Sequence, residues 1–271
     1  MNKLTELMKG RWTFAMLALG LATILTLSAF TLFDAEQVVH SETMLRSNQL
    51  YENGRFQEAT QTYQQLVDQG IEHASLYYNL GNAYYKVGDL GNAILNFERA
   101  SRLAPRDGDI AANLEYAHSL SLDRYEIDAH SPVEDWVGFA SSYLTLDELS
   151  ILVLGLFWLM AALIIAYRHR RYGRLRSLVQ TALLVVVLLF GISAFTLGSY
   201  LYMENTRPSA ILVTESVDIL SGPGEDHITE FSLHAGAQVR ILETRGQWFR
   251  LALPGEQFQG WAPLEVVETI S

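Results

Sequence analysis

The chain has 271 residues, no cysteine and a formal net charge of −11. The lack of cysteine excludes disulfides and cysteine-based metal sites or nucleophiles. The basic residues in excess lie in two short segments, 1–11 and 168–176, each beside a long apolar run, and this distribution is typical of a membrane protein. Without a Ser-His-Asp, metal-ligand or Gly-rich phosphate motif, the chain is expected to be non-enzymatic, with no cofactor, metal or nucleic-acid partner.

The first element is an uncharged run of 22 residues, 12–33, that follows the basic residues 1–11. It is either a signal anchor or a cleaved signal peptide. The apolar core of a signal peptide is shorter, about 7–15 residues, and ends at a small-residue cleavage site, so an uncleaved anchor is favoured. Residues 1–11 are then cytoplasmic, and the chain that follows Asp34 lies outside the cytoplasm.

Residues 41–122 contain an internal repeat. A shift of 34 residues aligns Tyr51 with Tyr85 and Gly54 with Gly88. This period, with small and aromatic residues at fixed spacing, resembles the tetratricopeptide repeat (TPR). The predicted units are two helical hairpins and a closing helix, at 41–72, 75–106 and 109–122. Because a continuous core usually needs about three units, this array is expected to lean on a partner, another copy or the juxtamembrane segment.

The first helices of stacked TPR units line a concave groove. On the second repeat the residues expected to face that groove are Tyr78, Asn79, Asn82, Tyr85 and Lys86. One interpretation is a groove that binds a protein partner. The other is that these side chains are half-buried surface residues, which are common in any fold.

Residues 131–144 predict a juxtamembrane amphipathic segment. Trp136, Phe139 and Tyr143 fall on one helical face, suited either to the membrane interface or to packing against the end of the repeats. Thr145 and Glu148 then form the pattern of a capping box at the start of the next helix.

Two uncharged runs, 149–167 and 178–202, follow. As helices they extend roughly 28 and 37 Å, enough to cross a bilayer core. The alternative is a buried helical hairpin with a basic turn. Small residues on each run predict close helix packing. They are Gly155, Ala162 and Ala166 on the first run and Gly191, Ala194 and Gly198 on the second.

The connection between these runs, 168–176, holds five arginines that predict a cytoplasmic loop, because short basic loops stay on that side. These topology-determining residues are Arg168, Arg170, Arg171, Arg174 and Arg176. The TPR and C-terminal domains are then both extracytoplasmic, in a multi-pass protein of a bacterial inner membrane.

Residues 210–271 consist of short β-branched and aromatic runs separated by Gly and Pro. They resemble a bacterial SH3-type domain and predict a small barrel with strands at 211–213, 217–220, 237–242, 248–251 and 259–261. Such a domain binds cell-wall peptides in some relatives. Packing of Trp248 and Trp261 in the barrel is the favoured interpretation of these aromatic residues.

The fold class is thus a multidomain membrane protein with an all-α TPR solenoid, transmembrane helices and a small all-β SH3-like barrel. The chain resembles the E-type member of the bacterial aerotolerance (Bat) family in its repeat core at 80–86, its sequence at 145–149 and its SH3-like end. The resemblance implies a scaffold in a cell-envelope complex, beside von Willebrand A-domain membrane proteins and a MoxR-type ATPase. The alternative is a peptidoglycan-binding envelope sensor that acts through the SH3-like domain.

Overall fold

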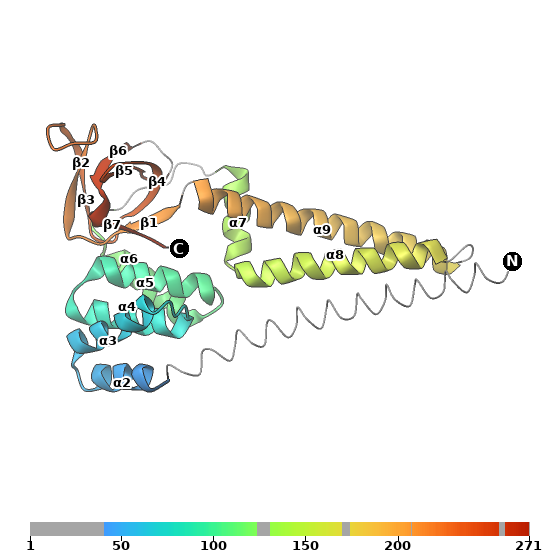
Figure 1. Ribbon diagram of the computed structural model, residues 1–271, viewed down its shortest axis with the longest axis horizontal. Helices are drawn as coiled ribbons and strands as arrows, with labels where there is room; N and C mark the ends of the chain where they lie inside the picture. The colour runs from blue at the N-terminus through green and yellow to red at the C-terminus, as the bar shows by residue number, and fades with distance from the viewer. Residues whose placement is uncertain (1–40, 124–130, 170–173, 207, 255–257, 271) are drawn as a thin grey trace.

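The computed structural model describes residues 41–123, 131–169, 174–206, 208–254 and 258–270. Within these residues, a head of short helices and one β-sheet carries a long hairpin of two helices (Figure 1). The predictions for residues 1–33, and for Arg170 and Arg171 of the basic loop, lie outside the described residues.

The helical part of the head consists of successive antiparallel hairpins with one closing helix. Its elements are α2 (Ser41–Glu52), α3 (Phe56–Asp68), α4 (Ala74–Val87), α5 (Leu90–Leu103) and α6 (Gly108–Leu120). Gly54 and Gly88 follow the first helix of each hairpin with φ of 74° and 85°, a left-handed conformation that glycine adopts without a Cβ penalty. The 34-residue shift therefore relates residues with the same backbone geometry.

Packing inside the second hairpin depends on small residues, as predicted. A Cβ atom at Gly81 would lie 2.8 Å from the Phe97 ring and 3.2 Å from the Ala93 carbonyl oxygen. Phe97 and its repeat equivalent Tyr63 are both buried and fill the space between helices. Glycine at position 81 is therefore required by the close approach of α4 and α5.

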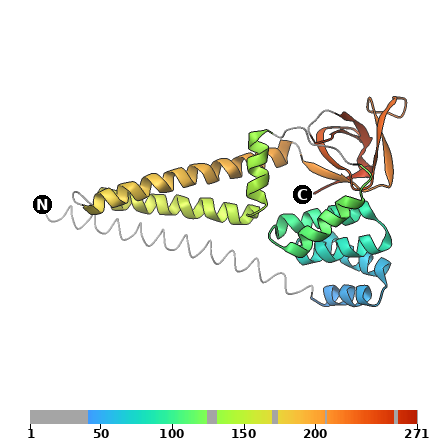
Figure 2. The same ribbon diagram turned by 180° about the vertical axis from the view of Figure 1, so that it is seen from behind.

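The hairpin begins after α7 (Pro132–Ser141) and consists of α8 (Leu146–His169) and α9 (Arg174–Thr206). Figure 2 shows both long helices projecting away from the head, with α7 crossing the end of the hairpin nearest to it. Both are long and apolar enough to cross a membrane, and only 6% of each apolar window is buried. The core helix of a soluble domain would instead be mostly buried.

Large side chains hold α8 against α9. The rings of Phe157 and Phe190 lie 6.3 Å apart, and Leu149 and Val186 are buried. A Cβ atom at Gly155, Gly191 or Gly198 would have no neighbour within 4 Å. The prediction that these glycines bring the two helices together is therefore wrong, and the contact between α8 and α9 includes the large rings of Phe157 and Phe190 instead.

The C-terminal part is a seven-stranded antiparallel sheet in the order β3-β2-β6-β5-β4-β1-β7. Its strands are β1 (Ser209–Leu212), β2 (Ser216–Leu220), β3 (Thr229–His234), β4 (Gln238–Arg245), β5 (Trp248–Ala252), β6 (Gln259–Pro263) and β7 (Val267–Thr269). In the described residues this sheet is not closed, since β3 and β7 are its two ends, and the predicted barrel is corrected to an open sheet. β3 and β7 were not among the predicted strands, because one is largely polar and the other has three residues.

The sheet and the helices share a core. Ile211 of β1 and Ile270 after β7 are buried in one cluster with Ile94 and Phe97. At Gly91 a Cβ atom would lie 2.6 Å from the carbonyl oxygen of Leu212, so α5 packs directly on the backbone of β1. The helical array thus packs against the C-terminal sheet. The expected contacts were with a partner, another copy or the juxtamembrane segment, and the sheet was not among them. It also contacts the juxtamembrane link, where Arg106 donates to the Tyr143 carbonyl oxygen at 2.6 Å.

Candidate protein-binding face of the helical repeats

The first helix of each repeat, α2, α4 and α6, contributes to one polar face of the head. We call this surface the first-helix face. It is formed by Asn48, Tyr78, Asn79, Asn82, Tyr85, Lys86, Asn113 and Tyr116. All five residues predicted from the second repeat lie on it, and each contributes from α4.

Two asparagine pairs cross this face from helix to helix. The Asn79 amide donates to Asn48 Oδ1 at 3.3 Å, and the Asn113 amide donates to Asn82 Oδ1 at 2.9 Å. The two pairs are related by the 34-residue shift, which carries Asn48 to Asn82 and Asn79 to Asn113. The two repeats therefore share an interhelical hydrogen bond as well as the same backbone geometry.

Tyrosines support the asparagine pairs from behind. The Tyr63 hydroxyl donates to Asn48 Oδ1 at 2.6 Å, and the Tyr78 hydroxyl accepts from the Asn113 amide at 3.1 Å. Burial, with smaller contributions from Tyr51 and Glu52, raises the pKa of Tyr63 to about 12, so its hydroxyl keeps its proton and remains a donor near neutral pH. The pairs are fixed in orientation by these bonds.

The end of the face towards the α4 C-terminus is aromatic and more exposed. The Tyr85 hydroxyl donates to the Tyr116 hydroxyl at 3.3 Å, and this bond is the main reason why the pKa of Tyr85 is raised. Lys86 Nζ lies 5.9 Å from the centre of the Tyr85 ring. Tyr116 is 54% exposed. This end can offer ring surfaces, hydroxyls and one cation to a partner.

Sequence reasoning missed Asn48 and Tyr116 as members of the face. The signal for Asn48 was present, because Asn48 aligns with Asn82 in the same 34-residue shift that revealed the repeat. The signal for Tyr116 was present as well, because the same shift carries Asn82 to Tyr116, whose ring contacts Tyr85.

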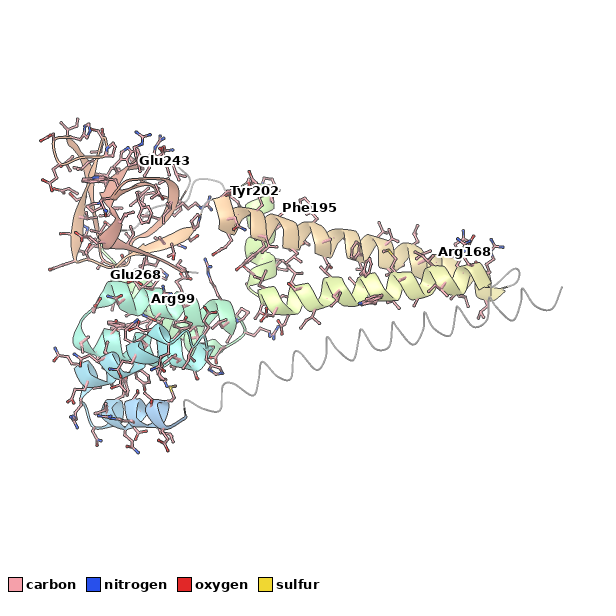
Figure 3. All side chains as sticks on the ribbon, viewed as in Figure 1. Arg99, Arg168, Phe195, Tyr202, Glu243 and Glu268 are labelled. Carbon is pink, nitrogen blue, oxygen red and sulfur yellow. The ribbon has the colours of Figure 1, made fainter. Side chains whose placement is uncertain are left out.

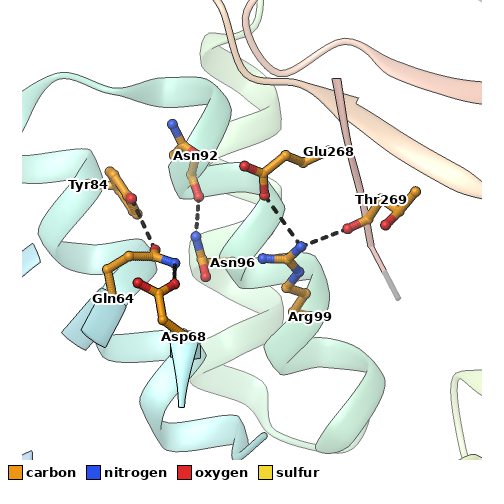
Figure 4. Close-up of polar contacts among 8 residues, drawn as sticks. All are labelled: Gln64, Asp68, Tyr84, Asn92, Asn96, Arg99, Glu268 and Thr269. Carbon is orange, nitrogen blue, oxygen red and sulfur yellow. Dashed lines mark hydrogen bonds and ion pairs between the residues drawn. The ribbon is translucent and has the colours of Figure 1, made fainter. Parts of the chain in front are cut away.

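Within the repeats, the described hydrogen bonds and ion pairs of the sheet go to Arg99 of α5 and Asp123 after α6, and none of them involves the first-helix face. Figure 4 shows Arg99 of α5 donating to the Thr269 carbonyl oxygen at 2.8 Å, with Glu268 Oε2 3.5 Å away. Asp123, after α6, accepts from the His234 backbone N–H at 2.6 Å. Within the described part of the chain, the sheet thus packs on α5, a second helix of a repeat.

The aromatic side chains of segment 131–144 do not pack against the repeats. One of them contacts α9, and the other two are exposed. Trp136 Nε1 donates to Thr196 Oγ1 at 2.8 Å, while Phe139 and Tyr143 are exposed and their rings lie 5.1 Å apart. Of the two expected arrangements, the structure therefore does not show packing of this face against the repeats. The Thr145–Glu148 capping box is confirmed by reciprocal bonds of 3.1 and 3.2 Å.

Three of the five loop arginines belong to the described residues. Arg168 is exposed at the end of α8, at the tip of the hairpin far from the head (Figure 3). The Arg176 guanidinium lies 4.8 Å from the centre of the Tyr167 ring and donates to its hydroxyl at 3.0 Å. Arg174 begins α9.

Comparison with known families concerns the helical head. The tetratricopeptide repeat family model matches residues 74–107, and a TPR repeat model matches residues 48–88. No curated protein matches the chain. Residues 48–107 are therefore tetratricopeptide repeats, a class of helical repeat that commonly binds protein partners.

Proposed function

We propose that this chain is a membrane-anchored, non-enzymatic scaffold in a bacterial cell envelope, and that its first-helix face binds a protein partner. One observation carries the proposal: a repeat-related row of amides and phenols crosses α2, α4 and α6, and its described hydrogen bonds run from helix to helix and not to the sheet. A partner helix or extended segment can exchange hydrogen bonds with such a row and stack on its aromatic end.

Membrane anchoring is supported by α8 and α9, whose apolar residues face outward along their length. The head would lie outside the cytoplasm, as the arginines at 168–176 favour. By its resemblance to the Bat family, the complex would include von Willebrand A-domain membrane proteins and communicate with a MoxR-type ATPase. Because that ATPase is cytoplasmic, it would act through another membrane protein or the basic loop.

The alternative, a peptidoglycan-binding SH3-like domain, has less support. Trp261, one of the two tryptophans of the domain, is 7% exposed, and the Arg245 guanidinium lies 5.0 Å from its ring centre. Low exposure and a guanidinium over the ring are both typical of an aromatic side chain that is packed in the domain.

Site-specific photo-crosslinking in intact membranes tests the scaffold proposal. A photoreactive residue at Lys86 or Tyr116 should give one discrete protein adduct. The same residue at Gln61, exposed on α3, is the matched control and should not give it. Equal adducts from all three positions, or an adduct from position 116 that survives Tyr85→Ala/Lys86→Ala at full yield, would contradict a partner on this face.

A further inference from the structure

A second site lies between the head and the hairpin, away from the first-helix face. A cavity of about 1120 Å³ is bounded by α5, α7, the outer part of α9 and β4. Among the residues that line it are Arg102, Glu134, Gly138, Gly198, Tyr202 and Arg240. The volume exceeds that of most small-molecule sites, which have roughly 300–1,000 Å³.

The position of the cavity follows from the unequal lengths of the hairpin helices. α9 has 33 residues and α8 has 24, and they are level where 170–173 joins them. The last nine residues of α9, from Gly198, therefore extend about 14 Å beyond the start of α8. Most of the α9 residues that line the cavity belong to this extension. If the hairpin spans a membrane as proposed, the cavity opens just above the bilayer surface.

An apolar stripe connects the cavity with the outer surface of the hairpin. Leu188, Ile192, Phe195 and Tyr202 are separated by four, three and seven residues, which places them on one face of α9. Each is more than half exposed, and Phe195 and Tyr202 also line the cavity. Figure 3 shows these two side chains on the part of α9 nearest to the head. An acyl chain could follow this stripe from the bilayer to the cavity.

The other end of the cavity carries both signs of charge. Arg102 binds Glu204 at 2.8 Å, and Arg240 binds Glu134 at 2.6 Å. Glu98 adds a third carboxylate to the lining. Each guanidinium has five N–H donors, so it can bind a phosphate oxygen in addition to its carboxylate. A ligand with one anionic and one cationic group matches this pattern better than a purely anionic one.

From these observations we propose that the cavity binds a zwitterionic phospholipid. Its phosphate would lie by Arg102 and Arg240, its ammonium group by the carboxylates, and one acyl chain along the α9 stripe. The lipid would fill the space between the repeats, the sheet and the hairpin, and so fix the height of the head above the membrane. This proposal rests on the membrane placement proposed above.

Two glycines allow a test by filling the cavity. Gly138 and Gly198 both line it, and a Cβ atom at either has no neighbour within 4 Å. Gly198→Leu should therefore occupy the cavity without a clash. Gly191→Leu is the matched control, because Gly191 lies on the same helix with equal space but not among the lining residues.

The full-length protein is reconstituted in vesicles of equimolar phosphatidylethanolamine and phosphatidylglycerol, extracted in mild detergent and examined by native mass spectrometry. The wild type and Gly191→Leu should retain phosphatidylethanolamine, and Gly198→Leu should retain about tenfold less, because position 198 lies beside Phe195 and Tyr202 on α9 and its side chain would obstruct the acyl chain. Gly138→Leu, on α7, should reproduce the loss from a second helix of the cavity wall.

Equal retention by Gly198→Leu and the wild type would overturn the proposal. So would an equal loss in Gly191→Leu, or retention of both lipids to the same extent. Carbonate extraction of the same membranes separates this proposal from the preceding one. Release of the chain would overturn the membrane placement, whereas a membrane-retained chain without bound lipid would overturn the lipid site alone.

Discussion

At the scale of single residues, two glutamates each connect a helix start to another part of the molecule. Glu134 accepts from the Ser131 backbone N–H at 2.9 Å and also binds Arg240 of the sheet. Glu148 does the same at the start of α8 and binds Arg106, which lies between α5 and α6. A capping box stabilises the start of its own helix. Here the glutamate of each capping box also binds an arginine of the head, and so connects the hairpin to it.

The Glu134 carboxylate should make the head sensitive to acid. Burial alone would raise its pKa, but hydrogen bonds from the Ser131 N–H and Arg240 outweigh burial, and the pKa lies below the usual 4.5. A group with a lowered pKa stabilises the fold above its unfolded value, and this contribution disappears as the pH falls through the folded value.

Glu134→Gln separates the ion pair from the capping box, because glutamine can still accept from the helix N-terminus. We expect it to cost about 1 kcal/mol at neutral pH, and Glu134→Ala about 2 kcal/mol. Thermal unfolding in detergent at several pH values measures both. The gap between the wild type and Glu134→Gln should close below about pH 4.5. A gap that stays constant in acid would contradict the role of the charge.

At the scale of elements, the contact between α5 and β1 defines the head. Gly91 stands where the first repeat has the exposed Gln57, so the two repeats differ at the position where the sheet docks. A side chain at 91 would meet the backbone atoms Leu212 O and Val213 Cα, which cannot rotate away.

Gly91→Ala should therefore separate α5 from β1 and destabilise the protein by about 2 kcal/mol. Gly108→Ala, at the start of α6, is the control because nothing lies within 4 Å of its Cβ position. It should be neutral or stabilising by up to about 1 kcal/mol. Chemical denaturation followed by tryptophan fluorescence distinguishes the two. Similar effects of both substitutions would mean that α5 and β1 are not in close contact.

At the scale of the whole molecule, the C-terminal sheet extends the hydrophobic core of the described repeats. Ile211 belongs to the core shared with the helices, whereas Ile219, equally buried, belongs to the core within the sheet. The two isoleucines therefore report on different parts of the head.

Ile211→Ala should increase hydrogen exchange in α5 and cost about 2–5 kcal/mol. Ile219→Ala should cost a similar amount but increase exchange mainly in β2 and β6, which pack around it. If Ile219→Ala opened α5 as much as Ile211→Ala, the helices and the sheet would unfold as a single unit.

The placement of the head relative to the membrane is also a property of the whole molecule. Under the proposed topology, in which the loop arginines lie on the cytoplasmic side, reporter fusions after residues 120, 173 and 271 should read outside, inside and outside the cytoplasm. A cytoplasmic reading at 120 would reverse the proposed topology. Replacing Arg168, Arg174 and Arg176 with glutamine should weaken the orientation without altering the head.

The amino-acid sequence by itself determined the features that arise within short stretches of chain. The 34-residue period specified two TPR units, two uncharged runs specified the long helices, and Thr145 with Glu148 specified a helix start. Each depends on residues close enough in sequence for periodicity or capping rules to relate them.

Only the tertiary structure decided which surfaces meet. Arg99 contacts Thr269 across 170 positions, and the helical and β segments carry no shared period that could reveal this contact. The same is true of the side chains between α8 and α9 and of the cavity below the head. Such contacts depend on the shapes of already folded elements, because buried area and close packing are properties of two surfaces together.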